Sequence, residues 1–242
     1  MIDSHCHLDC CSDIERIVND FDGIIITSGY DDKSNLKVID LVNKYPNVYG
    51  TLGIHPEEVD SKYDIDIIIN NLSNPKIIGI GEIGLDYHYI SENKEKQIKL
   101  FKKQLDIADK YNLPIVVHSR DAINDTFNIL SSYNLKGTIH CFSSSLEMAK
   151  KFIELGYKIG IGGVLTFKNG KKLREVVSGI SIKDILTETD SPYLSPEPFR
   201  GKENNSCNIK YILDELVKIK KCSYKEVLNT IKDNCITTFN IK

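Results

Sequence analysis

The chain has 242 residues, of which 31 are Lys or Arg and 34 are Asp or Glu, so its formal net charge is −3. A hydrophobic content of 41% beside 27% charged residues excludes a disordered chain, which could not bury enough apolar surface to fold. The sequence has no run of about 18 apolar residues, so we expect no membrane-spanning helix. The balanced charge excludes the strongly basic composition of proteins that wrap nucleic acid.

The N-terminus and the cysteines indicate the compartment. The chain begins Met1-Ile2-Asp3-Ser4-His5, without the basic start and apolar core of a signal peptide. Its seven cysteines form no C-x-x-C pair, which favours reduced thiols over a disulfide framework. The adjacent Cys10 and Cys11 are either ligands of a soft metal or small buried apolar residues. We therefore expect a cytoplasmic globular protein.

Short β-branched runs alternate along the chain with longer segments of helical periodicity. The runs show little polar alternation, which is typical of parallel strands buried on both faces; they are Ile2–Asp9, Gly23–Ser28, Val48–Ile54, Lys76–Leu85, Leu113–Ser119, Gly137–Ser143, Tyr157–Val164 and Asp184–Asp190. Helices are predicted near residues 13–20, 33–44, 63–72, 92–111, 121–133, 145–155 and 170–178, and an apolar stripe predicts another over 209–217. Ser144 with Glu147, and Ser223 with Glu226, have the spacing of a capping box at a helix start.

Eight strand–helix units in about 250 residues predict an α/β fold, a (β/α)8 TIM barrel with its reactive residues at the carboxyl ends of the strands. A doubly wound open sheet is the alternative, but such a sheet normally has a Gly-rich phosphate-binding loop after its first strand. This chain has His5 and His7 there instead. No internal repeat and no Pro/Gly/Ser-rich linker divides the sequence, so we expect a single domain over residues 1–242.

Histidines gather at the predicted strand ends. Five of the six histidines lie at or just beyond such an end. His5 and His7 are two residues apart, so both point to one face of the first strand while Cys6 points to the other. A single histidine would more often be a hydrogen-bonded core residue. Two imidazoles converging at the mouth of a barrel instead form half of a divalent-metal site.

Carboxylates extend this pattern to other strands. Glu82 lies deep in the apolar fourth strand, where an unpaired carboxylate would be costly unless a metal or a barrel lysine neutralises it. His118, His140 and Asp190 each close a predicted strand. Together with the histidine pair these residues exceed the three protein ligands of a usual catalytic zinc, so we predict two metals that share a bridging carboxylate. Glu188 is a weaker candidate, expected to orient a histidine.

Six short motifs together resemble the TatD family of metal-dependent deoxyribonucleases, within the amidohydrolase-like barrel superfamily. They follow the order of the family and are Asp3–Asp9, Gly53–Pro56, Gly81–Tyr87, Val117–Ala122, His140–Ser143 and Glu188–Leu194. Any one of them is weak evidence, but six in register are specific. The tail motif Arg200–Cys207 departs from the family, which usually has a proline near Cys207, so the shape of this loop is not carried over.

The resemblance implies a dinuclear centre of divalent ions such as Mg, Mn or Zn. Its ligands would be His5, His7, Glu82 and Asp190 for one metal and Glu82, His118 and His140 for the second, with Glu82 bridging. The implied reaction is phosphodiester hydrolysis by a metal-activated water, as a 3′–5′ exonuclease on single-stranded or damaged DNA. Asp190 is expected to take the proton of that water, with Glu82 as the other catalytic residue.

Substrate contacts are expected beside this centre, each with a structural alternative. His55 contacts the phosphate or the leaving oxygen, or else it is a hydrogen-bonded histidine that precedes Pro56. Arg120 pairs with phosphate through its planar guanidinium, or else with Asp121 or Asp125.

Single-stranded DNA is also expected to meet basic and aromatic residues near the site. The basic cluster is Lys168, Lys171, Lys172 and Arg174, which either steers the strand or forms a solvated helix face. The aromatic residues that could stack on bases are Tyr87, Phe167, Tyr193 and Phe199.

Three other functions remain open. The first is hydrolysis of an amide, lactone or phosphotriester on the same barrel, although such relatives often bridge their metals with a carbamylated lysine where this chain has Glu82. The second is deacylation of aminoacyl-tRNA, an activity also linked to the family. The third is a non-enzymatic metal-stabilised binding module, against which an open metal site argues. We expect DNA as the partner, no membrane and no obligate protein partner.

Overall fold

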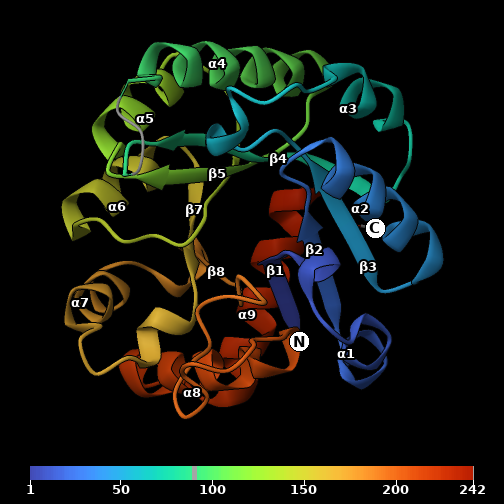
Figure 1. Cartoon of the computed structure of the whole chain (residues 1–242). Helices are drawn as coiled ribbons and strands as arrows, with labels where there is room; N and C mark the ends of the chain where they lie inside the picture. The colour runs from blue at the N-terminus through green and yellow to red at the C-terminus, as the bar shows by residue number, and fades with distance from the viewer. Residues whose placement is uncertain (89–91, 242) are drawn as a thin grey trace.

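The computed structural model describes residues 1–88 and 92–241. In these residues eight parallel strands form one sheet in the order β1 to β8 (Figure 1). The strands are β1 (Ile2–Cys6), β2 (Ile24–Ser28), β3 (Val48–Leu52), β4 (Ile77–Asp86), β5 (Ile115–Arg120), β6 (Gly137–Ile139), β7 (Tyr157–Ile161) and β8 (Ile185–Thr187). Strands that follow one another in sequence are neighbours in the sheet, as a TIM barrel requires. The predicted fold class is confirmed.

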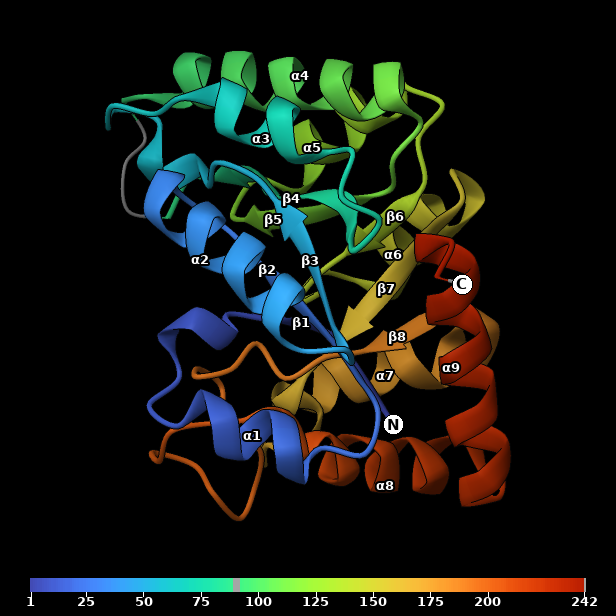
Figure 2. The same ribbon diagram turned by 90° about the vertical axis from the view of Figure 1, so that its right-hand side faces the viewer.

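Helices connect the strands and surround them (Figures 1 and 2). They are α1 (Ile14–Asp20), α2 (Asp32–Lys44), α3 (Ile65–Asn71), α4 (Lys94–Tyr111), α5 (Ile123–Leu130), α6 (Leu146–Glu154), α7 (Lys171–Gly179), α8 (Ile209–Lys220) and α9 (Tyr224–Phe239). Each predicted helix is present within a few residues of its predicted bounds. Within the described residues, no helix is both long and apolar enough to cross a membrane.

Two apolar cores hold the barrel together. The larger one lies between the strands and the helices and includes Ile25 of β2, Val38 of α2 and Leu105 of α4, all fully buried. The smaller one takes strand residues of the opposite parity, such as Ile26, together with Phe239 at the end of α9. Figure 2 shows α9 beside the end of the barrel at which the strands begin. Apolar side chains therefore fill this end, and the opposite end carries the polar site.

The two edge strands of the sheet meet just beyond their carboxyl ends. The backbone N–H of Asp190 donates to the carbonyl of His5 at 3.0 Å, and the N–H of His7 donates to the carbonyl of Ser191 at 2.7 Å. The register of β1 against β2 shifts between Asp3 and Cys6. These contacts place the chain segments after β1 and after β8 side by side at the mouth of the barrel.

The helix starts refine the sequence analysis. Ser223 accepts a hydrogen bond from the N–H of Glu226 at 3.2 Å, as the capping spacing predicts. At α6 the prediction is wrong by one residue, because Ser145 caps the helix and accepts from the N–H of Met148 at 3.3 Å. Two neighbouring serines offer the same chemistry, so spacing alone does not distinguish them.

Candidate metal centre

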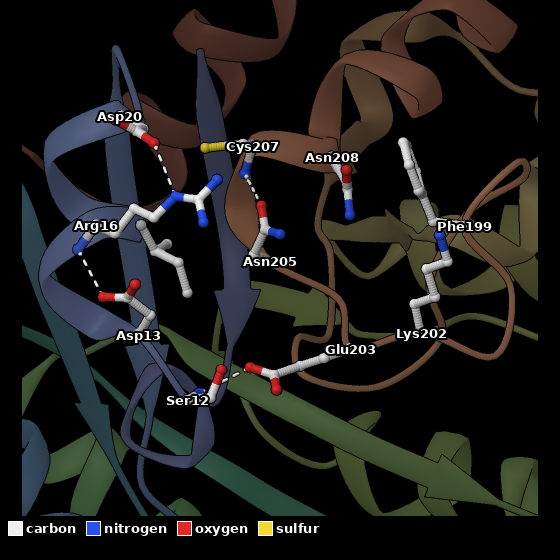
Figure 3. A pocket seen from close by; sticks show the side chains of 11 residues that line it. Ser12, Asp13, Arg16, Asp20, Phe199, Lys202, Glu203, Asn205, Cys207 and Asn208 are labelled. Atoms are coloured by element: carbon white, nitrogen blue, oxygen red, sulfur yellow. Dashed lines mark hydrogen bonds and ion pairs between the residues drawn. The ribbon is translucent and has the colours of Figure 1, made fainter.

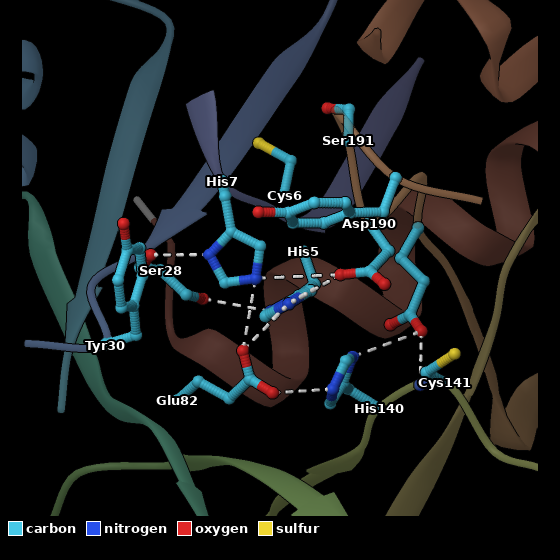
Figure 4. A network of polar contacts seen from close by, with 12 residues as sticks. His5, Cys6, His7, Ser28, Tyr30, Glu82, His140, Cys141, Asp190 and Ser191 are labelled. Atoms are coloured by element: carbon cyan, nitrogen blue, oxygen red, sulfur yellow. Dashed lines mark hydrogen bonds and ion pairs between the residues drawn. The ribbon is translucent and has the colours of Figure 1, made fainter. Parts of the chain in front are cut away.

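Histidines and carboxylates from around the barrel converge at its carboxyl-terminal mouth (Figure 4). His5 lies in β1 and His7 just after it, His55 in the turn after β3, Glu82 in β4 and His118 in β5. His140 and Asp190 lie in the segments that follow β6 and β8. The structure thus brings together all six predicted metal ligands and adds His55. The sixth histidine, His88, lies outside the cluster and pairs with Asp121 at 2.7 Å.

Glu82 is the centre of the cluster, and its side chain is only 3% exposed. Its Oε2 lies 3.4 Å from Nε2 of His5 and 3.2 Å from Nε2 of His7. Its Oε1 lies 2.9 Å from Nδ1 of His118 and 2.8 Å from Nε2 of His140. The two oxygens of one carboxylate therefore face two separate pairs of imidazoles, which is the arrangement expected of a bridging ligand.

Hydrogen bonds at the outer ring nitrogens determine which nitrogens face Glu82 as acceptors. His7 Nδ1 lies 3.2 Å from the backbone carbonyl of Ser28, and because a carbonyl only accepts, Nδ1 carries the proton of the neutral ring. His118 Nε2 lies 2.8 Å from Oδ2 of Asp86, and an ionised carboxylate also only accepts. His7 Nε2 and His118 Nδ1 therefore point their lone pairs at the oxygens of Glu82.

Acceptors that face each other at this distance need a cation between them, either a proton or a metal ion. His5 Nε2 also faces carboxylate oxygens: it is buried without a hydrogen-bond partner and lies 3.4 Å from both Glu82 Oε2 and Asp190 Oδ1. Imidazole nitrogens with carboxylate oxygens suit divalent metals. Three sets of ligand atoms lie within 4.8 Å of one another: His5, His7 and Asp190; His5, Glu82 and His140; His55, Glu82 and His118. The residues present fit divalent metal ions.

The protonation equilibria reflect this arrangement. Burial raises the pKa of the Glu82 carboxyl, but the imidazoles of His140, His55 and His118 outweigh it and hold this pKa well below its usual range. Burial lowers the pKa of His140, but the charges of Glu82 and Glu188 outweigh it and raise this pKa well above 6.5. The Glu82 carboxylate thus stays ionised and attracts positive charge to the cluster.

Asp190 lies three residues beyond β8, with a left-handed backbone at φ 54°. Its Oδ1 is 3.4 Å from His5 Nε2 and 3.6 Å from His7 Nε2. Burial raises its pKa, but the interaction with the His5 imidazole and the charge of His140 outweigh burial and lower it. The side chain is 14% exposed, against 3% for Glu82. Of these two carboxylates, Asp190 is therefore the one that water reaches.

Glu188 lies close to His140. It is fully buried, its Oε1 accepts the N–H of Cys141, and the same oxygen lies 3.7 Å from His140 Nδ1. Gly160 of β7 makes room for it, since a Cβ there would lie 2.5 Å from Glu188 Oε2. At 3.7 Å the two side chains are close but not hydrogen-bonded, and the prediction that Glu188 orients a histidine stays a prediction.

His55 differs from the other imidazoles of the cluster. Its Nδ1 accepts the N–H of Glu57 at 3.3 Å at the start of the 3-10 turn Pro56–Glu58. The proton of the neutral ring is therefore on Nε2, which lies 3.5 Å from Glu82 Oε1. The structural alternative is thus present, because His55 caps a turn; contact with the phosphate or the leaving oxygen stays a prediction.

Asp86 is a site residue to which the sequence analysis assigned no role. It is 3% exposed, and besides holding His118 its Oδ1 accepts the N–H of His88 at 2.9 Å. Gln97 of α4 fixes its backbone, accepting from the Asp86 N–H at 2.8 Å and donating to the Asp86 carbonyl at 2.7 Å. The signal in the sequence that could have identified Asp86 was its position as a carboxylate at the end of a strand.

The predicted substrate contacts lie at the rim. Arg120 ends β5 and is half-buried, and its charge contributes to the lowered pKa of Asp86. Asp121, one of the alternative partners of Arg120, pairs with His88, and Asp125, the other, accepts from the Tyr87 hydroxyl at 3.0 Å; the phosphate contact of Arg120 stays a prediction.

The basic cluster after β7 divides into two parts. Arg174 donates to the carbonyls of Leu165, Phe167 and Lys168 at 3.0, 2.7 and 3.1 Å. It therefore fixes the β7–α7 loop, and the prediction that Arg174 steers the substrate is replaced by this structural role. The lysines of the cluster are exposed, and steering by them stays a prediction.

A cavity of about 360 Å³ lies apart from the metal centre, between α1 and the loop that precedes α8 (Figure 3). Arg16, Phe199, Lys202 and Glu203 are among its lining residues, and Glu203 accepts a hydrogen bond from the backbone N–H of Ser12 at 2.7 Å across it. None of its described lining residues belongs to the histidine–carboxylate cluster.

Comparison with known proteins gives a consistent family. The family model of TatD-related DNases matches residues 2–240. The metal-dependent hydrolase YabD of Bacillus subtilis (strain 168) is 32% identical, with the match covering 100% of this chain and 99% of YabD. YcfH of Escherichia coli (strain K12), also named a metal-dependent hydrolase, is 32% identical over 100% of this chain and 96% of its own.

A solved structure agrees with these sequence matches. The crystal structure of YjjV, a TatD homologue from Escherichia coli K12, superposes with a TM-score of 0.93 at 29% identity, covering 100% of this chain and 98% of YjjV. The family model, the relatives and the fold coincide over almost the whole chain. The chain therefore belongs to the family of TatD-related DNases.

Proposed function

We propose that this metal-dependent hydrolase cleaves phosphodiester bonds of single-stranded DNA, removing nucleotides from the 3′ end. One observation carries the proposal: Glu82 presents its two oxygens to two separate pairs of imidazoles. A bridging carboxylate of this kind suits a pair of divalent metal ions. Bound there, such ions would lower the pKa of water and neutralise charge on the phosphate.

The ligands proposed for the two ions follow from the ring nitrogens that face Glu82. His5 Nε2, His7 Nε2 and Asp190 would hold one ion, and His118 Nδ1 and His140 Nε2 the other, with Glu82 shared. Ser28 and Asp86 keep the protons of His7 and His118 on the outer nitrogens. In the neutral rings of His7 and His118 the inner nitrogens therefore carry lone pairs that can bind a metal.

The remaining steps use side chains of this chain. Asp190 is ionised and is the carboxylate that water reaches, so it takes the proton of the attacking water. His55 presents its Nε2–H to the same space. That N–H is placed to donate a hydrogen bond to the sugar oxygen that leaves when the phosphorus–oxygen bond breaks, and the proton that Asp190 takes from water would pass to that oxygen.

Digestion of a single-stranded DNA oligonucleotide, labelled in turn at each end, tests the proposal. With Mg²⁺ or Mn²⁺ we expect stepwise shortening from the 3′ end, which EDTA and the double substitution His5→Ala, His7→Ala abolish. His88→Ala is the matched control, because His88 is the histidine outside the cluster, and it should retain activity. DNA that stays intact while the protein holds its metals would refute the nuclease, and esters and amides would then be the substrates to test.

A further inference from the structure

Two large apolar side chains are exposed beside the metal centre. Tyr193 is 56% exposed and its neighbour Leu194 is 37% exposed. The Tyr193 ring centroid lies 6.1 Å from that of His7. Other exposed large apolar residues of the described chain, such as Tyr111 and Tyr224, occur singly on helices, where exposure needs no explanation. An adjacent pair at the rim of a polar site is different, because exposed apolar surface at such a place marks ligand contact.

The other aromatic residues expected to stack on bases have covered rings. The Lys94 ammonium lies 4.3 Å from the ring centroid of Tyr87. The Arg200 guanidinium lies 3.9 Å from that of Phe167, which is 7% exposed. The ring of Phe199 packs at 5.4 Å against Tyr211, with the Lys202 ammonium 5.9 Å from its centroid. Among the four candidates, Tyr193 alone is more than one-third exposed.

The loop that carries Tyr193 is fixed by hydrogen bonds and close packing. The N–H of Tyr193 donates to the carbonyl of Asp190 at 2.9 Å. Asn204, fully buried, donates from Nδ2 to the carbonyls of Thr189 and Tyr193, both at 2.8 Å. Gly163 lies against Leu194, since a Cβ there would be 2.2 Å from the Leu194 carbonyl oxygen. The Tyr193 ring is therefore kept exposed to solvent by a loop that is itself fixed, and the same loop carries Asp190 of the proposed metal centre.

We propose that Tyr193, with Leu194 beside it, stacks on a nucleobase next to the scissile phosphate. This inference rests on the proposed nuclease function, and it identifies the substrate as a chain that carries planar bases rather than a bare phosphodiester. A phosphate held at the proposed metal centre would bring the attached nucleoside to the rim where Tyr193 lies. Because every base has a π face, such a contact binds DNA with little regard to sequence.

The experiment compares Tyr193→Ala and Tyr193→Phe with the wild-type protein on two oligonucleotides. One is an ordinary single strand, and in the other the two 3′-terminal nucleotides carry no base. Base–aromatic stacking is worth about 1–3 kcal/mol, so Tyr193→Ala should lower kcat/KM by about 5- to 150-fold on the ordinary strand. On the abasic strand it should change little, and Tyr193→Phe should resemble wild type on both. Tyr111→Ala, at a comparably exposed tyrosine on α4, is the control variant.

The outcomes distinguish failure of the base-stacking inference from failure of the proposed nuclease function. If Tyr193→Ala lowers kcat/KM equally on both strands, or on neither, base stacking is overturned while the nuclease stands. If the wild-type protein cleaves neither strand, the nuclease proposal fails, and the inference fails with it. A loss confined to the strand that carries its bases supports both.

Discussion

Replacing Asp86 with Asn should weaken metal binding, although Asp86 is not itself a proposed ligand. In the native chain its Oδ1 accepts the N–H of His88 and its Oδ2 faces Nε2 of His118. In Asp86→Asn the amide oxygen satisfies His88, so the amide NH₂ faces His118 Nε2. That nitrogen must then accept, and the proton of the neutral ring moves to Nδ1, the nitrogen that lies 2.9 Å from Glu82 Oε1.

The size of the effect follows from this exchange of tautomers. Loss of an outer partner of a metal-bound histidine usually costs about 10- to 100-fold in metal affinity or activity, which corresponds to about 1.4–2.7 kcal/mol. Calorimetric titration of the metal-free protein with Mn²⁺ measures the affinity, and ¹⁵N NMR of the imidazoles reports which nitrogen of His118 is protonated.

A matched control exists in the same region. Asp125→Asn alters a carboxylate that accepts from the Tyr87 hydroxyl, and its Mn²⁺ affinity should match wild type. Unchanged affinity in Asp86→Asn, with the His118 proton still on Nε2, would refute the reasoning.

Three further predictions concern the centre and its surroundings. Glu82→Gln should lower metal affinity by more than the about 100-fold upper range of outer partners, with an unchanged far-ultraviolet circular dichroism spectrum. Burial lowers the pKa of His5, but the neighbouring carboxylates outweigh burial and raise this pKa from 6.5 to about 9. The unfolding temperature of the metal-free protein should therefore fall as pH rises over this range. Bound Mn²⁺ should remove this fall. Gly160→Ala places a Cβ 2.5 Å from Glu188 Oε2 and should cost about 1–3 kcal/mol in urea unfolding, whereas Gly162→Ala, whose nearest atom would be 3.5 Å away, should cost less.

The barrel was predictable because each buried strand is a compact apolar run, and the pattern of such runs determines the architecture. Strand ends were less predictable. The sixth and eighth strands were expected to continue to Ser143 and Asp190, but β6 ends at Ile139 and β8 at Thr187. Cys141 and Asp190 have left-handed backbones, at φ 45° and 54°. An apolar pattern carries no information about such a turn. At these turns the chain leaves the hydrogen-bonded strand, and the functional groups begin there.

The side chains of the centre were predictable for a related reason. His5 and His7 point into the mouth while Cys6 belongs to the outer core, as the two-residue period of a strand predicts. Their supporting partners were not predictable, because each comes from a different strand. Asp86 reaches His118 across 32 residues of sequence. Such pairs depend on strand register, including the register shift of β4 against β5 between Ile80 and Ile83, which spacing along one strand does not show.

The central claim is that Glu82 bridges two metal ions in the mouth of this barrel. Anomalous diffraction from crystals of the whole chain grown with Mn²⁺ tests it directly. The account predicts two peaks, one near His5 Nε2, His7 Nε2 and Asp190, the other near His118 Nδ1 and His140 Nε2, with Glu82 in contact with both. A single peak that Glu82 does not contact, or manganese bound elsewhere while this cluster holds none, would contradict it.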